Sequence, residues 1–223
     1  MSLISLRKNN ACAIIPFFNE EEFITKVIKK TQKYVDLVIA IDDGSTDNSL
    51  SLVKKIENVE VIIFDRNYGK GTALRAGFSL ALELDFDKII TLDADLQHDP
   101  DLIPSFLTAL KNFDVVIGNR LSNTKSMPVQ RILSNFLTSF LLSIKLRKKI
   151  KDSQCGFRAY RKEVLRKISI HSPGFEAESE IIVKAVKEGF NIGFIDIPTI
   201  YGYEKSKMKS FQTIKGFIKV LRL

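Results

Sequence analysis

The stretch "DKIITLDADLQHDPDLIPSFLTALKNFDVVIGNR", residues 87–120, holds two short apolar runs, "DKIITL" and "FDVVIGNR", on either side of a helical segment, "PDLIPSFLTALK". Short continuous apolar runs are typical of parallel strands buried on both faces. Asp93 and Asp95 follow the first run, and Arg120 ends the second. The stretch therefore predicts a strand–helix–strand unit with polar side chains at one edge of a sheet.

The same alternation of strand and helix precedes this stretch. The expected strands lie within residues 11–20, 36–47 and 59–64, and the expected helices within residues 20–35, 45–57 and 69–84. We predict an α/β fold in which a doubly wound, mostly parallel, Rossmann-like sheet is flanked by helices. In such sheets ligands bind beyond the carboxyl ends of the strands.

The second half of the chain departs from this alternation. In order, we expect a long apolar then basic helix over residues 129–150, a loop leading into a short helix over 152–163, an amphipathic helix over 174–190, a strand over 191–201, a basic loop over 203–210 and a final helix over 211–223. No repeat or linker is visible, so we expect a single domain over residues 1–223.

Composition narrows the class of protein. The 34 Lys and Arg residues against 26 Asp and Glu give a net charge of +8, which suits nucleic acid, an anionic membrane or a phosphate-bearing substrate. The basic residues are scattered without an aromatic-rich reading motif, so we do not expect nucleic acid as a partner. The two cysteines form no CxxC pair, and no signal peptide or run of about 18 apolar residues is visible. We therefore expect a reducing, cytosolic compartment.

Two carboxylates one residue apart mark the end of the first run. Alternate residues of a strand share a face, so Asp93 and Asp95 converge if the backbone stays extended. Like charges that lie close together cost free energy unless a cation neutralises them, and hard oxygen ligands suit Mg²⁺ or Mn²⁺. Asp93, Asp95 and Gln97 are therefore candidate metal ligands. The alternative is a solvated turn followed by a helix cap at Asp99.

Three other polar groups are candidates, each with a plainer alternative. Asp42 and Asp43 either form a turn or bind a base or ribose. The glycines of "NYGKGTALRAGF" either make a tight turn or expose amides to an anion, with Lys70 or Arg75 able to meet a phosphate. Acidic residues at the start of a helix either favour its dipole or face an acceptor, and here they are Glu176, Glu178 and Glu180.

Isolated residues carry weaker signals. Arg158 lies between aromatic residues in "GFRAY", where a guanidinium is either solvated or buried and paired. His98 and His171 have no ligand spacing around them, and we expect both at the surface.

Eight motifs occur in order along residues 11–209: "IIPFFNEEE", "IDDGSTDNS", "NYGKGTALRAGF", "TLDADLQHDPDLIP", "VVIGNR", "DSQCGFRAYRKEVL", "GFEAESEIIVKAVKEGF" and "EKSKM". Together they resemble the family 2 glycosyltransferases, and specifically the dolichol-phosphate mannose synthase-like branch. The resemblance implies a GT-A fold, a nucleotide-sugar donor and inverting transfer onto a polyprenyl phosphate. It divides the chain into a nucleotide-sugar-binding half (11–120), an acceptor half (121–209) and a C-terminal amphipathic helix (210–223).

The resemblance also assigns roles residue by residue. Nucleotide-sugar binding falls to Pro16, Phe18, Glu20, Asp43, Lys70, Asp93, Ala94, Asp95, Gln97, Arg120, Arg131, Lys205 and Lys207. The implied metal ligands for Mg²⁺ or Mn²⁺ are Asp93, Asp95 and Gln97. The acceptor phosphate is assigned to Arg131, Ser134 and Arg158, and the catalytic roles to Asp95, Arg120 and Glu178. Phe18 stands where the family usually has tyrosine.

The chemistry expected from these roles depends on the acceptor. A phosphate monoester has a second pKa of roughly 6, so it is largely dianionic at neutral pH and needs no general base. A sugar hydroxyl would need one, and Glu178 or Glu176 would be the candidates. GDP-mannose is the leading donor by resemblance, with UDP-glucose and UDP-N-acetylglucosamine open.

Other readings of the function stay open. One keeps the fold and changes the acceptor to a saccharide. A more remote one is a non-enzymatic phosphoacceptor signalling module, which also groups acidic residues at strand ends.

A polyprenyl-phosphate acceptor implies a location at the cytosolic face of a membrane. We expect a cytoplasmic protein that associates peripherally with that surface. Two apolar, basic-flanked helices, 129–150 and 211–222, either lie in the membrane interface or pack on the core. A membrane-anchoring partner subunit or a missing C-terminal segment is an open alternative.

Overall fold

The computed structural model describes residues 9–124, 127–198, 200 and 210–223, without the side chains of 210–214. Within these residues one seven-stranded sheet forms the centre, with the strand order β3-β2-β1-β4-β6-β5-β7. The strands are β1 (Ala11–Phe17), β2 (Leu37–Asp42), β3 (Val59–Ile63), β4 (Lys88–Thr91), β5 (Val115–Asn119), β6 (Arg158–Arg161) and β7 (Ile192–Asp196).

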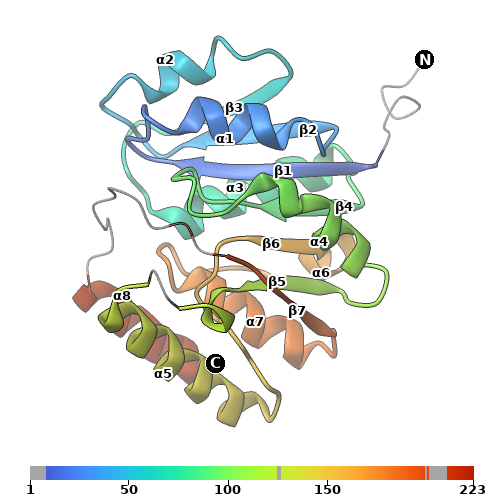
Figure 1. Ribbon diagram of the computed structural model, residues 1–223, viewed down its shortest axis with the longest axis vertical. Coiled ribbons are helices and arrows are strands. Elements are labelled where there is room, and N and C mark those ends of the chain that lie inside the picture. Colours follow the sequence, from blue (N-terminus) through green and yellow to red (C-terminus); the bar gives the residue numbers. More distant parts are fainter. Residues whose placement is uncertain (1–8, 125–126, 199, 201–209) are drawn as a thin grey trace.

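The helices cover the sheet on both faces (Figure 1). They are α1 (Ile24–Thr31), α2 (Ser49–Val53), α3 (Lys70–Glu83), α4 (Ile103–Ala109), α5 (Val129–Leu146), α6 (Lys162–Lys167), α7 (Ala177–Lys187) and α8 (Ser210–Arg222), with short 3₁₀ turns η2 (Pro100–Leu102) and η3 (Arg120–Ser122). α3 packs on β1 and β2, and α4 packs on β6 and β7. α5 and α8 pack against α7 and against each other at the lower end of the molecule in Figure 1.

The strand pairing is parallel except around β6. β1 pairs with β2 and β4, β2 with β3, and β5 with β7, all in parallel. The apolar runs predicted as buried strands are buried, with Ala11 through Ile15 fully inaccessible. Parallel strands end at the same edge, which brings the segments after Phe17, Asp42, Thr91 and Asn119 to one side of the sheet.

β6 corrects one expectation. We predicted a loop leading into a short helix over residues 152–163. The short helix is present as α6, but residues Arg158–Arg161 before it form a strand antiparallel to both β4 and β5. Two arginines in four residues hide the apolar signal of a central strand. This segment becomes a strand because it pairs with β4 and β5 on either side, and its own amino-acid composition does not indicate that pairing.

The long helix is shorter than predicted. It was expected over residues 129–150, but it ends at Leu146 because Arg147 adopts a left-handed conformation with φ of 50°. A left-handed residue after the last turn is a common way for a helix to stop. The basic residues that follow therefore belong to a loop.

Candidate active site

The acidic pair lies just beyond β4. The chain turns sharply at Leu96, whose φ is +58°, and the Gln97 amide donates to Asp95 Oδ1 at 3.0 Å. The Asp93 side chain is 27% exposed, whereas Ala94 and Gln97 are buried. A carbon added at Gly156 would come within 2.3 Å of Asp93 Oδ2. The position of the Asp93 carboxylate therefore depends on a glycine in the loop before β6.

Lys70 joins the acidic pair to α7. It is the first residue of α3, and its ammonium donates to the Asp93 carboxylate and to Glu178 Oε1, the latter at 2.6 Å. The Lys70 side chain is 13% exposed and that of Glu178 is 5% exposed. Burial alone would lower the pKa of Lys70, but Asp93 and Glu178 outweigh it and raise that pKa above its ordinary value. Three segments distant in sequence thus meet in one ionic cluster.

The glycines around Lys70 serve close packing. The Gly71 amide donates to the Pro173 carbonyl at 2.8 Å, and a carbon added at Gly71 would meet the Ser172 carbonyl at 2.1 Å. Gly69 has a φ of +94° and donates its amide to Asp43 Oδ2 at 2.9 Å. Both amides are hydrogen-bonded within the protein. This agrees with the tight turn, which was one of the two predicted alternatives, and leaves neither amide exposed to an anion.

Asp42 and Asp43 brace loops at the same edge. Asp43 accepts from the Tyr68 amide at 2.7 Å as well as from Gly69, and burial raises its pKa despite these bonds. Asp42 accepts from the Ser45 amide at 2.9 Å. Asp43 therefore fixes the turn that presents Lys70.

His98 is buried, contrary to our expectation of a surface position. Its side chain is 1% exposed, Nε2 lies 3.8 Å from Asp93 Oδ2, and the ring packs against Phe157. Neither ring nitrogen has a hydrogen-bond partner among the described residues. Burial lowers the pKa of His98 to about 4, so the ring is neutral near pH 7. The sequence "QHDP" resembles a solvated turn, but the bend at Leu96 folds it over the core. His171 is exposed, as expected.

Arg120 is committed to a partner that sequence reasoning missed. Its guanidinium forms a bidentate pair with Asp152, with Nε donating to Oδ2 at 2.8 Å and Nη2 to Oδ1 at 3.0 Å. Both residues are buried. Asp152 opens the motif "DSQCGFRAY", which the sequence predicted to be a loop, so nothing in the sequence indicated that this carboxylate is buried. The pair places Arg120 at the end of β5, next to the loop that leads into β6.

Arg158 is removed from the predicted acceptor-phosphate set. It is fully buried, and its guanidinium donates to the carbonyls of Cys155 at 2.6 Å, Glu178 at 2.6 Å and Ser153 at 2.9 Å. A guanidinium enclosed in this way has no access to a lipid phosphate. It instead ties the loop before β6 to the first turn of α7.

The acidic residues of α7 have separate tasks. Glu178 pairs with Lys70, while Glu180 accepts from the amides of His171 and Ser172. Glu176 precedes the helix and accepts from the Gly174 amide at 3.3 Å. Of the three, Glu178 is the residue that Lys70 connects to the acidic pair.

The remaining predicted residues lie around this edge or outside the described residues. Pro16, Phe18 and Glu20 are half-buried at the end of β1, where the Glu20 amide donates to Ser49 Oγ at 2.7 Å. Arg131 is half-buried and Ser134 exposed on the first turns of α5, which packs against η3. Lys205 and Lys207 fall within 201–209, outside the described residues.

The donor set suits a divalent cation that shares its coordination with a ligand. Among the described residues no group of three or more His, Cys, Asp and Glu side chains is arranged to hold a metal ion. Asp93 and Asp95 are two partly exposed carboxylates, which are hard oxygen ligands. Mg²⁺ is commonly bound by one or two carboxylates with substrate phosphates and water as the other ligands. The residues present therefore fit a metal that arrives with a diphosphate.

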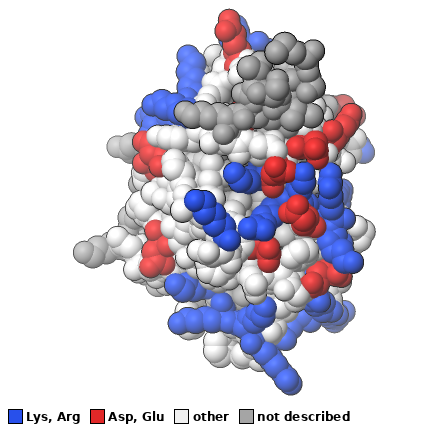
Figure 2. Space-filling view, turned by 90° about the vertical axis from the view of Figure 1, so that its right-hand side faces the viewer, with Lys and Arg blue, Asp and Glu red and all other residues white. Residues whose placement is uncertain are grey.

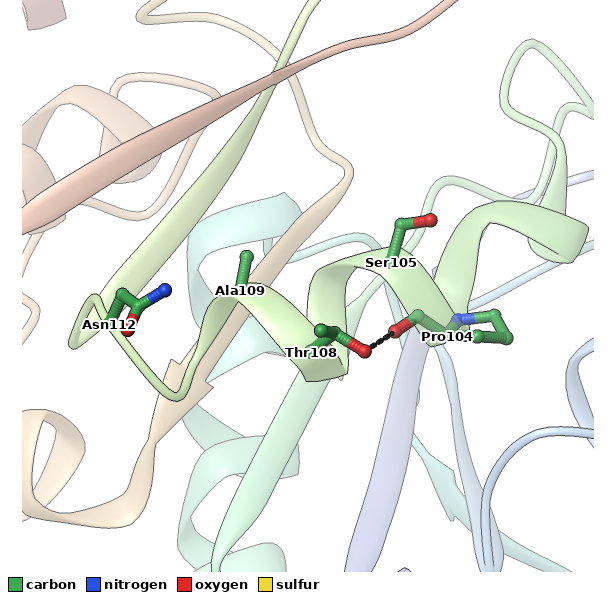
Figure 3. A pocket seen from close by; sticks show the side chains of 5 residues that line it. All are labelled: Pro104, Ser105, Thr108, Ala109 and Asn112. Atoms are coloured by element: carbon green, nitrogen blue, oxygen red, sulfur yellow. Dashed lines mark hydrogen bonds between the residues drawn. The ribbon is translucent and has the colours of Figure 1, made fainter.

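A surface hollow elsewhere does not compete with this site. Pro104, Ser105, Thr108, Ala109 and Asn112 line a hollow of about 390 Å³ along α4 (Figure 3). No charged side chain lines it, and Thr108 Oγ1 donates to the Pro104 carbonyl at 2.8 Å. The hollow therefore presents no positive charge to an anionic ligand.

Residues 12–169 match the family model described as Glycosyl transferase family 2. The chain belongs to glycosyl transferase family 2. The predicted family is therefore confirmed, and this protein is a glycosyltransferase.

Curated relatives of this family 2 transferase extend over most of its length. The UDP-N-acetylglucosamine–dolichyl-phosphate N-acetylglucosaminyltransferase of Methanococcus voltae is 33% identical, over 94% of this chain and 93% of the relative. The undecaprenyl-phosphate 4-deoxy-4-formamido-L-arabinose transferase of Proteus mirabilis is 35% identical, over 70% of this chain and 50% of the relative. The names of both relatives specify a polyprenyl-phosphate substrate.

Solved structures confirm the fold of this family 2 transferase. Glucosyl-3-phosphoglycerate synthase from Mycobacterium tuberculosis, in complex with Mn²⁺, UDP and phosphoglyceric acid, matches with a TM-score of 0.77 at 18% identity, over 96% of this chain and 79% of that chain. The GT-A fold predicted from the sequence is thus confirmed.

Proposed function

We propose that this family 2 transferase moves a sugar, with inversion, from a nucleoside diphosphate sugar onto a polyprenyl phosphate. The observation that carries the proposal is the ionic cluster of Asp93, Lys70 and Glu178 beside Asp95, at the edge where the parallel strands end. Such an edge is where open α/β sheets bind nucleotides. The similarity to the Methanococcus voltae enzyme over nearly the full length of both chains supports the acceptor class.

The donor that we put first is UDP-N-acetylglucosamine. Resemblance of the motifs alone favoured GDP-mannose, with UDP sugars as the alternative. The similarity to a relative named for UDP-N-acetylglucosamine now favours the alternative, and GDP-mannose becomes the second donor to test.

Each residue of the cluster has a task in this proposal. Asp93 and Asp95, with Gln97, would hold Mg²⁺ or Mn²⁺, which when bound neutralises the charge of the departing diphosphate. Lys70 supplies a positive charge at the start of α3. Glu178 holds the Lys70 ammonium. A phosphate acceptor, with a second pKa of roughly 6, brings its own ionised nucleophile and asks no residue to accept a proton.

The outer face of α5 supports a membrane-bound acceptor. This helix buries Asn135, Ser139 and Leu142, while its opposite face is apolar. Six exposed apolar residues follow the spacing of one helix face and are 51–78% exposed: Val129, Leu133, Phe136, Leu137, Phe140 and Ile144. A surface helix usually places its apolar residues inward. An apolar stripe turned outward marks a surface that meets another apolar phase.

Basic residues follow the apolar stripe. Exposed cations continue from the end of α5 into the next loop: Arg147, Lys148, Lys149 and Lys151. Figure 2 shows Lys and Arg side chains gathered at this lower end of the molecule. We infer that α5 lies on an anionic bilayer at the cytosolic face, since apolar area and basic charge together favour that surface.

The second candidate helix behaves differently. α8 buries Phe217 and Val220 and leaves Ile218 exposed at 45%. None of the helices in the described part of the chain is both long and apolar enough to cross a bilayer. The proposed attachment rests on α5.

A transfer assay tests the proposed function. The purified chain is incubated with Mn²⁺, vesicles containing a polyprenyl phosphate, and radiolabelled UDP-N-acetylglucosamine, UDP-glucose or GDP-mannose. Label transferred into the lipid phase from one donor, and lost with Asp95→Asn, is the expected result. Transfer only to soluble saccharides would replace the lipid acceptor, and no binding of any nucleotide would overturn the proposal.

A further inference from the structure

Lys70 has a position that the proposed donor site does not by itself explain. Its ammonium lies between Asp93 and Glu178, so a carboxylate proposed to hold the metal already holds a cation of the protein. We propose that Lys70 is an internal counter-ion that competes with the divalent metal for Asp93, so that the metal binds well only together with the donor's diphosphate. The inference rests on the proposed function and deepens it.

The backbone at Lys70 is anchored, whereas its long side chain can change rotamer. The backbone of its turn is held by the Gly71 amide on the Pro173 carbonyl and by the Gly69 amide on Asp43. The side chain itself has four rotatable carbons, and its ammonium lies 5.6 Å from the centre of the Phe175 ring. The ammonium can therefore leave Asp93 while the start of α3 stays in place.

The surrounding charges make Lys70 the cation that balances this cluster. The Arg120 guanidinium is already engaged by Asp152 in a bidentate pair. Without Lys70, the Asp93 carboxylate would face Glu178 across the site with its charge unbalanced. A protein cation at this position balances the partly exposed Asp93 and the buried Glu178 when no metal is bound.

The same charge opposes a bare metal ion. A divalent cation at Asp93 would meet the ammonium at close range, and like charges repel strongly in a partly buried site. A diphosphate removes this conflict because its oxygens bind the metal and accept from Lys70. Metal and nucleotide should therefore bind with positive coupling, and Lys70 should be the source of part of that coupling.

Manganese binding without turnover tests this inference. The Kd of Mn²⁺ is measured by electron paramagnetic resonance on the purified chain, with and without UDP, or with GDP if the transfer assay selects it. We expect Lys70→Met to bind Mn²⁺ at least about tenfold more tightly than the wild type in the absence of nucleotide, because a like charge has been removed. We also expect UDP to strengthen Mn²⁺ binding less in this variant than in the wild type.

Matched variants separate charge from folding. Lys70→Arg keeps the positive charge, so its Mn²⁺ affinity should stay near the wild-type value. Lys70→Met combined with Glu178→Gln removes one charge of each sign, which protects the fold. Because the ammonium no longer occupies Asp93, this variant should still bind Mn²⁺ more tightly than the wild type. Lys55→Met, at an exposed position just after α2, should leave the Mn²⁺ affinity unchanged.

The outcomes distinguish this inference from the function on which it rests. Unchanged or weaker Mn²⁺ binding in both Lys70→Met variants would overturn the role of Lys70, even if the transfer assay succeeds. Tighter binding in those variants supports it. The arm without nucleotide decides this alone, so a chain that binds no nucleotide would overturn the proposed function while leaving the Lys70 test readable.

Discussion

Arg120 and Asp152 form a bidentate ion pair inside the protein, with donor–acceptor distances of 2.8 and 3.0 Å and a third bond from the Arg120 amide to Asp152 Oδ2 at 3.2 Å. The pair joins the end of β5 to the loop before β6 across 32 positions of sequence. It therefore connects the part of the chain that carries the acidic pair to the part that carries Glu178.

Removing one member of this pair should destabilise the fold. Asp152→Asn leaves the buried Arg120 guanidinium without its counter-charge, and we expect a loss of about 3–5 kcal/mol in the free energy of unfolding. Urea denaturation followed by circular dichroism measures it. Asp65→Asn, at an exposed position, should change stability by less than about 0.5 kcal/mol. If Asp152→Asn changes the free energy of unfolding as little as Asp65→Asn is expected to, the ion pair contributes little to stability.

Gly156→Ala should damage activity more than stability. The added carbon would lie 2.3 Å from Asp93 Oδ2, so the carboxylate has to move. A displacement of about 1 Å at a reacting site can cost up to about 100-fold in rate, and we expect a loss of that order in kcat/KM. Initial-rate assays with the donor selected above measure it.

Gly189→Ala is the control for Gly156→Ala. At Gly189 nothing lies within 4 Å of an added carbon, but the φ of +85° strains any other residue. We expect lower stability, by roughly 1 kcal/mol, with unchanged kcat/KM. Full activity of Gly156→Ala would mean that the Asp93 carboxylate tolerates displacement.

The loop that contacts Lys70 should weaken in acid through Glu180. Burial raises the pKa of Glu180, but hydrogen bonds from Lys184 and from the His171 and Ser172 amides outweigh this and hold that pKa below the usual 4.5. The ionised carboxylate therefore stabilises the fold fully above the unfolded-state pKa, and this contribution is lost as pH falls through the lower folded-state pKa.

Glu180→Gln tests that pH dependence. At pH 7 we expect this variant to be less stable than the wild type by about 1–2 kcal/mol, since the hydrogen bonds lose their charge. The difference should shrink as the pH is lowered below 4.5, which urea titrations at several pH values measure. A difference that stays constant down to pH 3 would assign the effect to shape alone.

The outward face of α5 should control binding to lipid. Phe136 and Phe140 stack with ring centres 6.1 Å apart and are 60% and 51% exposed. We expect Phe136→Ser with Phe140→Ser to weaken partitioning onto anionic vesicles by at least about tenfold, while thermal stability stays unchanged. Vesicle sedimentation measures it.

Gln130→Ser is the control for the α5 variant, because Gln130 is exposed and polar on the same helix. Its vesicle binding should match that of the wild type. Wild-type binding of the double variant would mean that α5 does not contact the bilayer.

The strands and the acidic pair could be predicted because their signals are local. Continuous apolar runs indicate buried parallel strands, and carboxylates directly after such a run indicate the ligand-binding edge of the sheet. β6 was missed because its strand state is imposed by β4 and β5 on either side, and the arginines in "FRAYR" hide its burial.

The errors at individual side chains have the same origin. Arg158 is positively charged, so it was assigned to the acceptor phosphate. Its actual partners are the backbone carbonyls of Ser153, Cys155 and Glu178. His98 contains no ligand spacing, which suggested the surface, but the bend at Leu96 turns it inward. The partner of a buried polar group is decided by contacts between distant segments, which a single sequence does not display.

β6 lies between β4 and β5, both of which come earlier in the chain, so the sheet is completed only by a later segment. A chain cut before residue 158 would leave β4 and β5 with open facing edges, which invite pairing with other copies. We therefore expect that the two halves of the chain cannot be exchanged between relatives as modules. We expect new substrates to arise by substitutions within the whole sheet, and grafting experiments should follow loops and helix faces instead of the boundary at residue 120.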